Sequence, residues 1–218
     1  MLSKTSLTFP STKYGVKSAA LTFTLTNKGN TALTLTGTGM GITVGGTDPT
    51  SFAQTNNCGS SLAAGKVCTI SVTFKPVATG TLTGTVRFGD NAAAGSPQKV
   101  LLTGTGDGAL VSLSHTSLTF AATKVGAASA AQTVTLANKG NVALTLTGTG
   151  LGITVGGTDP TSFTQTNNCG TSLAGGKACT ITVTFKPKAT GALTANLRFG
   201  DNNAAGSPQK IPMTGTGQ

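Results

Sequence analysis

The stretch "NNCGSSLAAGKVCTISVTF", residues 56–74, returns as "NNCGTSLAGGKACTITVTF" at residues 167–185. Each version encloses a loop of small residues between two cysteines and then continues as alternating apolar and hydroxyl side chains. Such alternation is typical of a β-strand with one buried face. The stretch therefore predicts a strand that begins at a pair of cysteines, and the chain contains it twice.

The duplication extends over almost the whole chain of 218 residues. Residues 6–106 align with residues 117–217 without a gap, and 77 of the 101 aligned positions are identical. Each copy has the size of an ordinary domain, whereas the unit of a solenoid is much shorter. We therefore expect two tandem domains, residues 1–107 and 108–218, each of which folds by itself.

Alternating segments recur within each copy. In "LTFTLT", residues 21–26, three apolar side chains share one face and three threonines share the other. Turn motifs rich in Gly, Asn and Pro separate such segments, and none has a helical period. The pattern predicts an all-β fold: two tandem seven-stranded antiparallel immunoglobulin-like β-sandwiches. In the first copy we expect strands at residues 5–9, 21–26, 33–35, 41–44, 69–74, 82–88 and 100–102.

The differences between the copies also carry information. Apolar positions exchange conservatively, as Phe23 does for Val134, which is what a buried position requires. Leu101 becomes Pro212. Because proline has no N–H to donate, we expect this position at a sheet edge or a bulge.

The four cysteines form one pair in each copy. Their spacing does not fit a zinc site or a thioredoxin-like Cys-x-x-Cys motif, which leaves a disulfide or two buried free thiols. We favour disulfides, because closing so short a loop contributes roughly 2.5–3 kcal/mol to stability. That choice implies an oxidising compartment. The expected bonds are Cys58 to Cys68 and Cys169 to Cys179.

Composition and charge exclude several classes of function. Only 9% of residues are charged, there are five acidic residues, and the formal net charge is +10. The basic residues are dispersed singly and form no basic-aromatic stripe, so we expect no specific nucleic-acid partner. No apolar run is long enough to span a membrane. The first residues, "MLSKTSLTF", lack the apolar segment of a secretory signal, and we expect that such a signal has been removed.

No constellation of residues predicts catalysis. His115 is the only histidine, and we expect it at the surface. Asp48 and Asp159 precede proline, where a carboxylate serves a turn or an N-cap. We therefore expect no enzyme, no cofactor and no metal site. Candidate binding residues lie in the loops at 45–57 and 89–97 and in their repeats, where polar side chains gather: Asn56, Asn57, Asp90, Asn91, Asn167, Asn168, Asp201 and Asn202.

The order of the motifs resembles a known family. "SLTF", "TLTNKGNTALTLTG", "GTDPTSF", the block from Cys58 to "TFKP", "GDNAAAGSP" and "LTGTG" are similar to bacterial Hydin-like repeats of the ASH superfamily, of the choice-of-anchor D type. These repeats are related to the major sperm protein fold. The resemblance covers nearly the whole chain twice, and it implies a β-sandwich used as a spacer, adhesion or scaffold module without catalytic residues.

Two functional hypotheses follow. The first is a secreted or cell-surface structural protein, a scaffold, an adhesion module or a filament-forming subunit. Because the two copies are nearly identical, a contact between the tail of one and the head of the next can repeat without closing. The alternative is a module of a secreted protein that binds a glycan or another protein, or a structural component of a phage virion.

Overall fold

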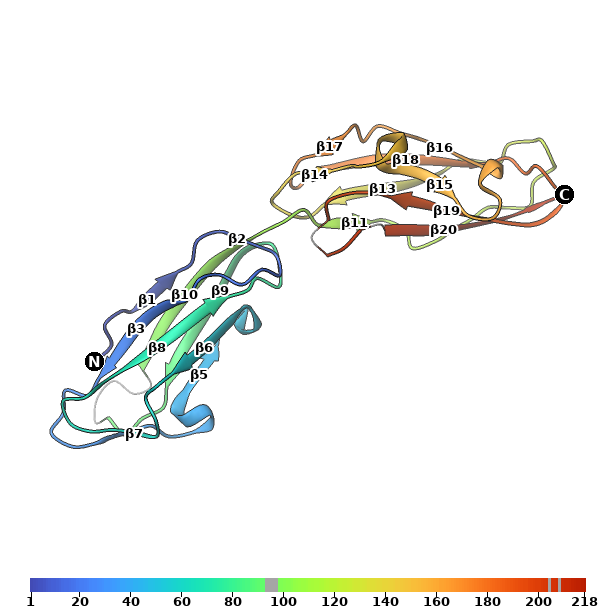
Figure 1. Ribbon diagram of the computed structural model, residues 1–218. Coiled ribbons are helices and arrows are strands. Elements are labelled where there is room, and N and C mark those ends of the chain that lie inside the picture. Colours follow the sequence, from blue (N-terminus) through green and yellow to red (C-terminus); the bar gives the residue numbers. More distant parts are fainter. Residues whose placement is uncertain (93–97, 204, 208) are drawn as a thin grey trace. The chain divides into compact units, whose positions relative to one another are not determined.

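The structure is a computed structural model that describes residues 1–92, 98–203, 205–207 and 209–218. The chain divides into two compact units, Met1–Asp107 and Gly108–Gln218, and each is described by itself (Figure 1). The regular structure of the described residues consists of β-strands and four short 3₁₀ helices. The all-β class is confirmed. Of the loop at 89–97, residues 93–97 lie outside the described residues.

Unit 1 contains two main sheets, which are mostly antiparallel. The larger sheet has the order β1-β10-β9-β5, with β2 also paired to β10, and the smaller has the order β3-β8-β6. A short pair, β4 and β7, lies beside them. The elements are β1 (Ser6–Thr8), β2 (Thr12–Lys13), β3 (Leu21–Thr26), β4 (Leu33–Thr34), η1 (Thr38–Gly41), β5 (Ile42–Gly45), η2 (Pro49–Ser51), β6 (Phe52–Asn56), β7 (Ser61–Leu62), β8 (Val67–Phe74), β9 (Gly80–Phe88) and β10 (Gln98–Asp107).

Unit 2 repeats this plan. Its sheets have the orders β12-β20-β19-β15 and β11-β13-β18-β16, with β14 paired to β17. The elements are β11 (Val111–Leu113), β12 (Leu118–Thr119), β13 (Gln132–Asn138), β14 (Leu144–Thr145), η3 (Thr149–Gly152), β15 (Ile153–Gly156), η4 (Pro160–Ser162), β16 (Phe163–Asn167), β17 (Ser172–Leu173), β18 (Ala178–Phe185), β19 (Gly191–Phe199) and β20 (Gln209–Gly217).

The first segment of each unit changes sheets, and this corrects one expectation. In unit 1 it bridges β3 antiparallel at Leu2 and then pairs with β10 in parallel as β1. Unit 2 does the same, with β11 along β13 and β12 along β20. The expectation of purely antiparallel sandwiches is therefore wrong for this strand. Its parallel partner is the last strand of the unit, β10 or β20. The two strands are far apart in the sequence, so the chain between them provides the long connection that parallel pairing requires.

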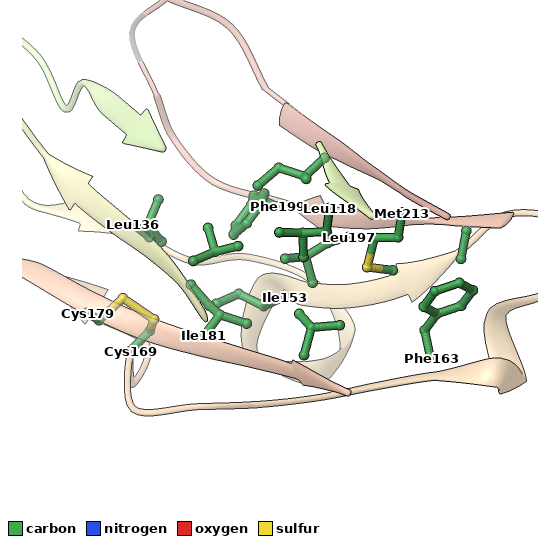
Figure 2. Packing of buried hydrophobic residues seen from close by; sticks show 14 of the residues in the cluster. Leu118, Leu136, Ile153, Phe163, Cys169, Cys179, Ile181, Leu197, Phe199 and Met213 are labelled. Carbon is green, nitrogen blue, oxygen red and sulfur yellow. A yellow bond between two sulfur atoms is a disulfide. The ribbon is translucent and has the colours of Figure 1, made fainter. Parts of the chain in front are cut away.

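The core of each unit lies between its two sheets. In unit 2, side chains of both sheets meet around Ile153, Ile181 and Phe199, and the disulfide lies at one end of this core (Figure 2). Three phenylalanine rings fill the other end, with ring centroids 4.9–5.9 Å apart. The glycine of "TGTG" makes room for them, because a Cβ at Gly215 would lie 2.6 Å from the Phe185 ring. The alternating residues thus form the core that their pattern predicts.

Pro212 does not lie at a sheet edge, as its lack of an N–H had suggested. It lies in β20, an inner strand between β12 and β19. The equivalent residue of unit 1, Leu101, donates its N–H to the Thr5 O at 2.9 Å, so that N–H faces the first strand. In unit 2 that strand begins only at Leu118, which pairs with Met213. The proline is accommodated because its partner strand starts one residue later.

Candidate functional site

Asparagine side chains gather at one end of each unit, which we call the asparagine-rich end. In unit 1 it comprises the turns that follow β3, β6 and β9, and in unit 2 the turns that follow β13, β16 and β19. Strand pairing brings these turns together: Leu33 pairs with Leu62, and Leu35 bridges Asp90. The turns that carry the predicted binding residues therefore share one end of each sandwich.

The buried asparagine of the "NKGN" turn is the centre of this end. Asn27 Nδ2 donates to the Thr31 O at 2.7 Å and to the Leu62 O at 2.9 Å, and Asn27 Oδ1 accepts from the Gly29 N–H at 3.0 Å. Asn138 repeats these contacts with Val142, Leu173 and Gly140. In each unit the asparagine side chain thus replaces a backbone donor and links the "NKGN" turn to β7 or β17.

Asn138 has a further contact, because residues that join the two repeats lie against the same turn in unit 2. Its Oδ1 also accepts from the Leu110 N–H at 3.1 Å. Gly108 donates its N–H to Asn141 Oδ1 at 3.0 Å, and its carbonyl accepts from the Asn141 N–H at 3.1 Å. The segment Gly108–Leu110 is therefore part of the asparagine-rich end of unit 2.

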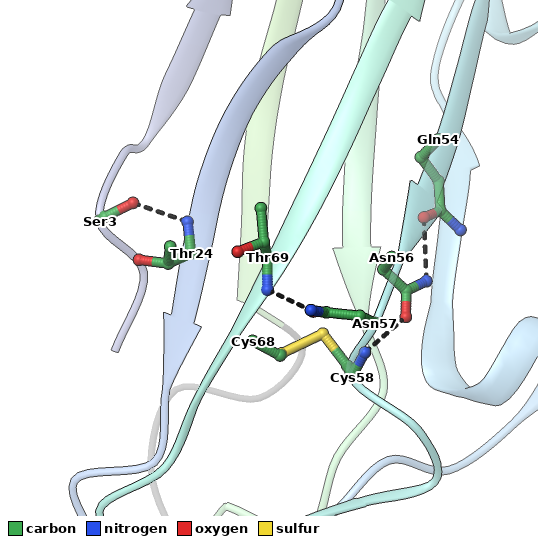
Figure 3. Close-up of a disulfide and its surroundings, with 8 residues drawn as sticks. All are labelled: Ser3, Thr24, Gln54, Asn56, Asn57, Cys58, Cys68 and Thr69. Carbon is green, nitrogen blue, oxygen red and sulfur yellow. Dashed lines mark hydrogen bonds between the residues drawn. A yellow bond between two sulfur atoms is a disulfide. The ribbon is translucent and has the colours of Figure 1, made fainter.

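The cysteines are disulfide-bonded. Cys58 is bonded to Cys68 and Cys169 to Cys179, and the described residues contain no free cysteine. In unit 1 the bond joins the turn after β6 to the first residues of β8 (Figure 3). Both cysteines are at most 4% exposed, so the sulfurs belong to the core.

Asn56 and Asn57 hold the turn that carries this disulfide. Asn56 Oδ1 accepts from the Cys58 N–H at 3.1 Å, and Asn57 Oδ1 accepts from the Thr69 N–H at 2.7 Å (Figure 3). Asn56 Nδ2 donates to Gln54 Oε1 at 3.1 Å. In unit 2, Asn167 and Asn168 make the same contacts with Gln165, Cys169 and Thr180. These candidates are engaged by their own unit.

The remaining candidates hold the turn after β9 or β19. Asn91 Oδ1 accepts from the Thr34 N–H at 2.9 Å, and Asn202 Oδ1 accepts from the Thr145 N–H at 2.8 Å. Asp90 Oδ1 accepts from the Ala92 N–H at 2.9 Å.

The corresponding carboxylate of unit 2, Asp201, is 9% exposed and accepts from the Asn203 N–H at 2.9 Å. Burial raises the pKa of Asp201, and hydrogen bonds from the Asn203 backbone and from the Ser207 and Gln209 side chains oppose that rise.

The other titratable residues that the sequence drew attention to lie outside this end. Asp48 precedes η2, but its carboxylate makes no cap bond; Oδ2 accepts from the Thr83 N–H at 2.8 Å. Asp159 does the same with Thr194. These aspartates therefore tie η2 and η4 to β9 and β19, which corrects the N-cap alternative. His115 lies at the surface, with Nδ1 2.8 Å from Ser114 Oγ.

In the part of the chain that the structure describes, no group of three or more His, Cys, Asp or Glu side chains is arranged to hold a metal ion. No helix formed by those residues is long and apolar enough to cross a membrane.

Sequence reasoning missed two parts of this end. The buried role of Asn27 and Asn138 was hidden, because "NKGN" reads as an ordinary turn. The strand β6 (Phe52–Asn56) was assigned to loop, because it follows directly on the "DPTS" turn. The signal for the asparagine was the unchanged "NKGN" in both copies, beside neighbours that do change.

Comparison with known proteins identifies a family for the second repeat. A family model described as Cep192 domain 4 matches residues 108–218. A search of the curated proteins finds no match.

Solved structures with similar folds are distant. A structure of the VesB protease of Vibrio cholerae is 18% identical, with a TM-score of 0.38 over 49% of this chain and 31% of that one. The ASH/PapD-like domain 7 of human CEP192 is 18% identical, with a TM-score of 0.34 over 50% of this chain and 84% of that one. The periplasmic chaperone SfaE is 12% identical, with a TM-score of 0.35 over 98% of both chains.

Proposed function

The chain belongs to the Cep192 domain 4 family, with an immunoglobulin-like fold of the ASH/PapD-like kind, and from that premise we propose that it is a non-enzymatic structural repeat protein. Its work is that of a scaffold or adhesion subunit, in which each sandwich is a spacer that holds its neighbours at a distance. Within this family we place it with the bacterial Hydin-like repeats of the choice-of-anchor D type, on the motifs quoted above.

The observation that carries this proposal is the use of the polar side chains. At the asparagine-rich end, Asn27, Asn56, Asn57 and Asn91 all hydrogen-bond to groups of their own unit. A catalytic or high-affinity site needs polar groups that converge on a substrate, whereas these groups stabilise turns. The chemistry of this end is structural.

The division of the chain into two domains is part of the same proposal. We assign residues 1–107 and 108–218 to two independently folding domains. We propose seven principal strands for each domain; the described strands of three or more residues in unit 1 are β1, β3, β5, β6, β8, β9 and β10. Of the two-residue strands, β4 pairs with β7 and β14 with β17, whereas β2 and β12 pair with the last strand of their unit. Each domain closes its own disulfide, which supports independence.

We also propose that the protein works outside the cytoplasm. The two disulfides support this location, because such bonds persist in oxidising compartments and are rare in the cytosol. A surface with few charges and many threonines is compatible with it.

Assembly into head-to-tail arrays is the form of scaffold that we propose. The test is light scattering together with negative-stain microscopy of the full chain, over a range of concentration, salt and pH. Linear assemblies that lengthen with concentration are expected, since a head-to-tail contact between nearly identical repeats would not be self-closing. Monodisperse monomers under all conditions would contradict the array, while leaving a single-molecule spacer.

One observation favours a second role, glycan binding. A hollow of about 260 Å³ at the asparagine-rich end of unit 1 is lined by Thr55, Asn56, Asn57, Thr69 and Ser71. Hydroxyl and amide groups of this kind suit sugar hydroxyls. Glycan-array screening of the full chain tests the role, with Thr69→Val and Ser71→Ala as variants that spare the asparagines. Binding that both variants abolish would support it, and an empty array would remove it.

A further inference from the structure

Unit 2 begins with a segment, Gly108–Val111, that takes part in its packing. At the repeat offset of 111 residues, Gly108–Val111 corresponds to four positions before Met1. In unit 2 these residues lie along the "NKGN" turn. The Lys139 N–H donates to the Leu110 O at 2.7 Å, and the Asn141 and Val142 N–H groups donate to the Gly108 O at 3.1 and 3.2 Å.

The middle residue of this segment belongs to the core. Ala109 is 2% exposed and forms part of the hydrophobic cluster of unit 2. Gly140, in the turn below it, is buried. A Cβ on Gly140 would lie 2.1 Å from the Gly108 O and 2.9 Å from the Ala109 Cα, so only glycine lets the segment approach.

In unit 1 the same place is a hollow of about 400 Å³. Its lining includes Met1, Asn27, Gly29, Leu33 and Ala92. Gly29 is exposed, and a Cβ there would meet nothing nearer than Asn27 Oδ1 at 3.2 Å. Within the described residues, the N–H groups of Lys28, Asn30 and Thr31 have no acceptor, although their counterparts in unit 2 are bonded.

The N-terminal residue, Met1, lies at this hollow and is held there by backbone hydrogen bonds. The Met1 ammonium donates to the Thr26 O at 2.7 Å, and the Thr26 N–H donates to the Met1 O at 2.9 Å. Ser112 holds the corresponding place in unit 2, opposite Ala137. A residue placed before Met1 therefore continues along the turn that begins at Asn27, as Val111 does along Asn138.

We propose that the hollow of unit 1 is an acceptor site for an extended inter-repeat segment with the chemistry Gly-Ala-Leu-Val, entered directly before Met1. This deepens the proposed function, because it makes each repeat complete only when such a segment precedes it. The small first residue brings its carbonyl to the turn amides. The alanine enters the core, and the third residue donates its N–H to Asn27 Oδ1.

Two differences between the units reduce the fit in unit 1. Val111 donates its N–H to Asn203 Oδ1 at 3.0 Å, but unit 1 has Ala92 at that position. Unit 2 has Gly175 where unit 1 has Ala64, and a Cβ at Gly175 would lie 2.8 Å from the Gly140 O. The substitutions Ala92→Asn and Ala64→Gly should therefore strengthen the interaction.

The test is the full chain extended by Gly-Ala-Leu-Val directly before Met1, compared with an extension of Gly-Ser-Gly-Ser. Amide hydrogen exchange is measured by NMR. We expect exchange at Lys28, Asn30 and Thr31 to slow by about tenfold or more in the first chain, since each amide gains an acceptor. Equal exchange in the two extended chains would overturn the assignment of the alanine and leucine.

Two variants confirm the geometry. Gly29→Ala in the extended chain should abolish the protection, because its Cβ takes the place of the segment backbone. An extension of Gly-Asp-Leu-Val should also abolish it, because a carboxylate would enter the core. Protection that survives both variants would contradict the proposal. The measurement is intramolecular, so it succeeds or fails independently of whether the chain forms arrays or binds glycans.

Discussion

At the scale of single residues, the buried side-chain amides of Asn27 and Asn138 make hydrogen bonds to backbone carbonyls that would otherwise need a donor from a neighbouring strand. Asn27 is 6% exposed and Asn138 is fully buried, and each satisfies backbone groups of two separate segments. A buried carbonyl that loses its donor costs more free energy than a surface hydrogen bond contributes. These two asparagines should therefore be among the least replaceable polar residues of the chain.

Replacing Asn27 with alanine should lower the free energy of unfolding of unit 1 by about 1–3 kcal/mol, because the Thr31 and Leu62 carbonyls lose their donor. Urea unfolding followed by tyrosine fluorescence reports on this unit, since Tyr14 is the only tyrosine and the chain has no tryptophan. Asn30→Ala is the matched control at an exposed position and should change stability by less than about 0.5 kcal/mol. Equal effects of the two substitutions would contradict the buried role.

A second residue-scale prediction concerns the carboxylate of Asp201. Since burial raises the pKa of Asp201 in the folded state, the folded chain holds that proton more tightly than the unfolded chain. Between the unfolded pKa, about 3.9, and the raised folded value, stability should fall as pH rises. Below the unfolded pKa the penalty disappears.

Asp201→Asn should remove this dependence, so the variant should gain stability over the parent as pH increases from about 3 to 7. Thermal unfolding of both chains by calorimetry across that range measures the difference. Asp90→Asn, at the equivalent position of unit 1, is the comparison. A stability difference that grows as pH falls would show that the sign is wrong.

At the scale of elements, the disulfide lies at the start of β8 and of β18. In each unit it joins the turn after β6 or β16 to the second residue of the long strand that pairs with two neighbours. Closing this short loop limits the unfolded chain, and Asn56 and Asn57 hold the folded turn in the matching conformation. The repeated cysteine block therefore combines the turn, the disulfide that closes it and the strand that follows.

Replacing Cys58 and Cys68 together with alanine should lower the stability of unit 1 by about 2–4 kcal/mol. The tyrosine transition in urea should shift accordingly. The pair Cys169→Ala and Cys179→Ala is the matched control, because it should leave the Tyr14 transition in place if the units fold independently. A similar shift in both variants would contradict the two-domain plan.

Much of the element order could be predicted from the sequence, because alternation identifies strands that have one buried face. The strands predicted in this way at 21–26, 69–74 and 82–88 correspond to β3 and to all but the first two residues of β8 and of β9. The strand β6 was missed because it follows directly on the "DPTS" turn and because Phe52 is its only large apolar residue, so its sequence shows no apolar alternation. The position of Pro212 was predicted wrongly. The missing N–H of a proline has a cost only where the neighbouring strand offers an acceptor, and the sequence pattern does not show where that neighbouring strand begins.

The candidate site was predicted in part. Sequence position alone selected Asn56, Asn57, Asp90 and Asn91, and the structure brings them to one end. Their inward hydrogen bonds could not be predicted, because a turn asparagine and a ligand-binding asparagine look alike in one sequence. The predicted boundary put Gly108–Leu110 at the start of the second domain, but the role of these residues there could not be predicted, since only the packing reveals that Ala109 enters the core.

At the scale of the whole molecule, the two repeats differ beside the "NKGN" turn. Unit 2 buries a segment there and unit 1 has a hollow instead. On the proposal above, the free energy of unfolding of a repeat depends on the segment that precedes it, as in repeat proteins whose stability is a sum of intrinsic repeat stabilities and interface terms.

The central claim is that the protein is a disulfide-closed scaffold that works in an oxidising compartment. Thiol trapping tests it most directly: protein from its native source is denatured in iodoacetamide, and its intact mass is measured with and without prior reduction. We predict no alkylated cysteine before reduction and four after it. Four alkylated cysteines without reduction would contradict the claim.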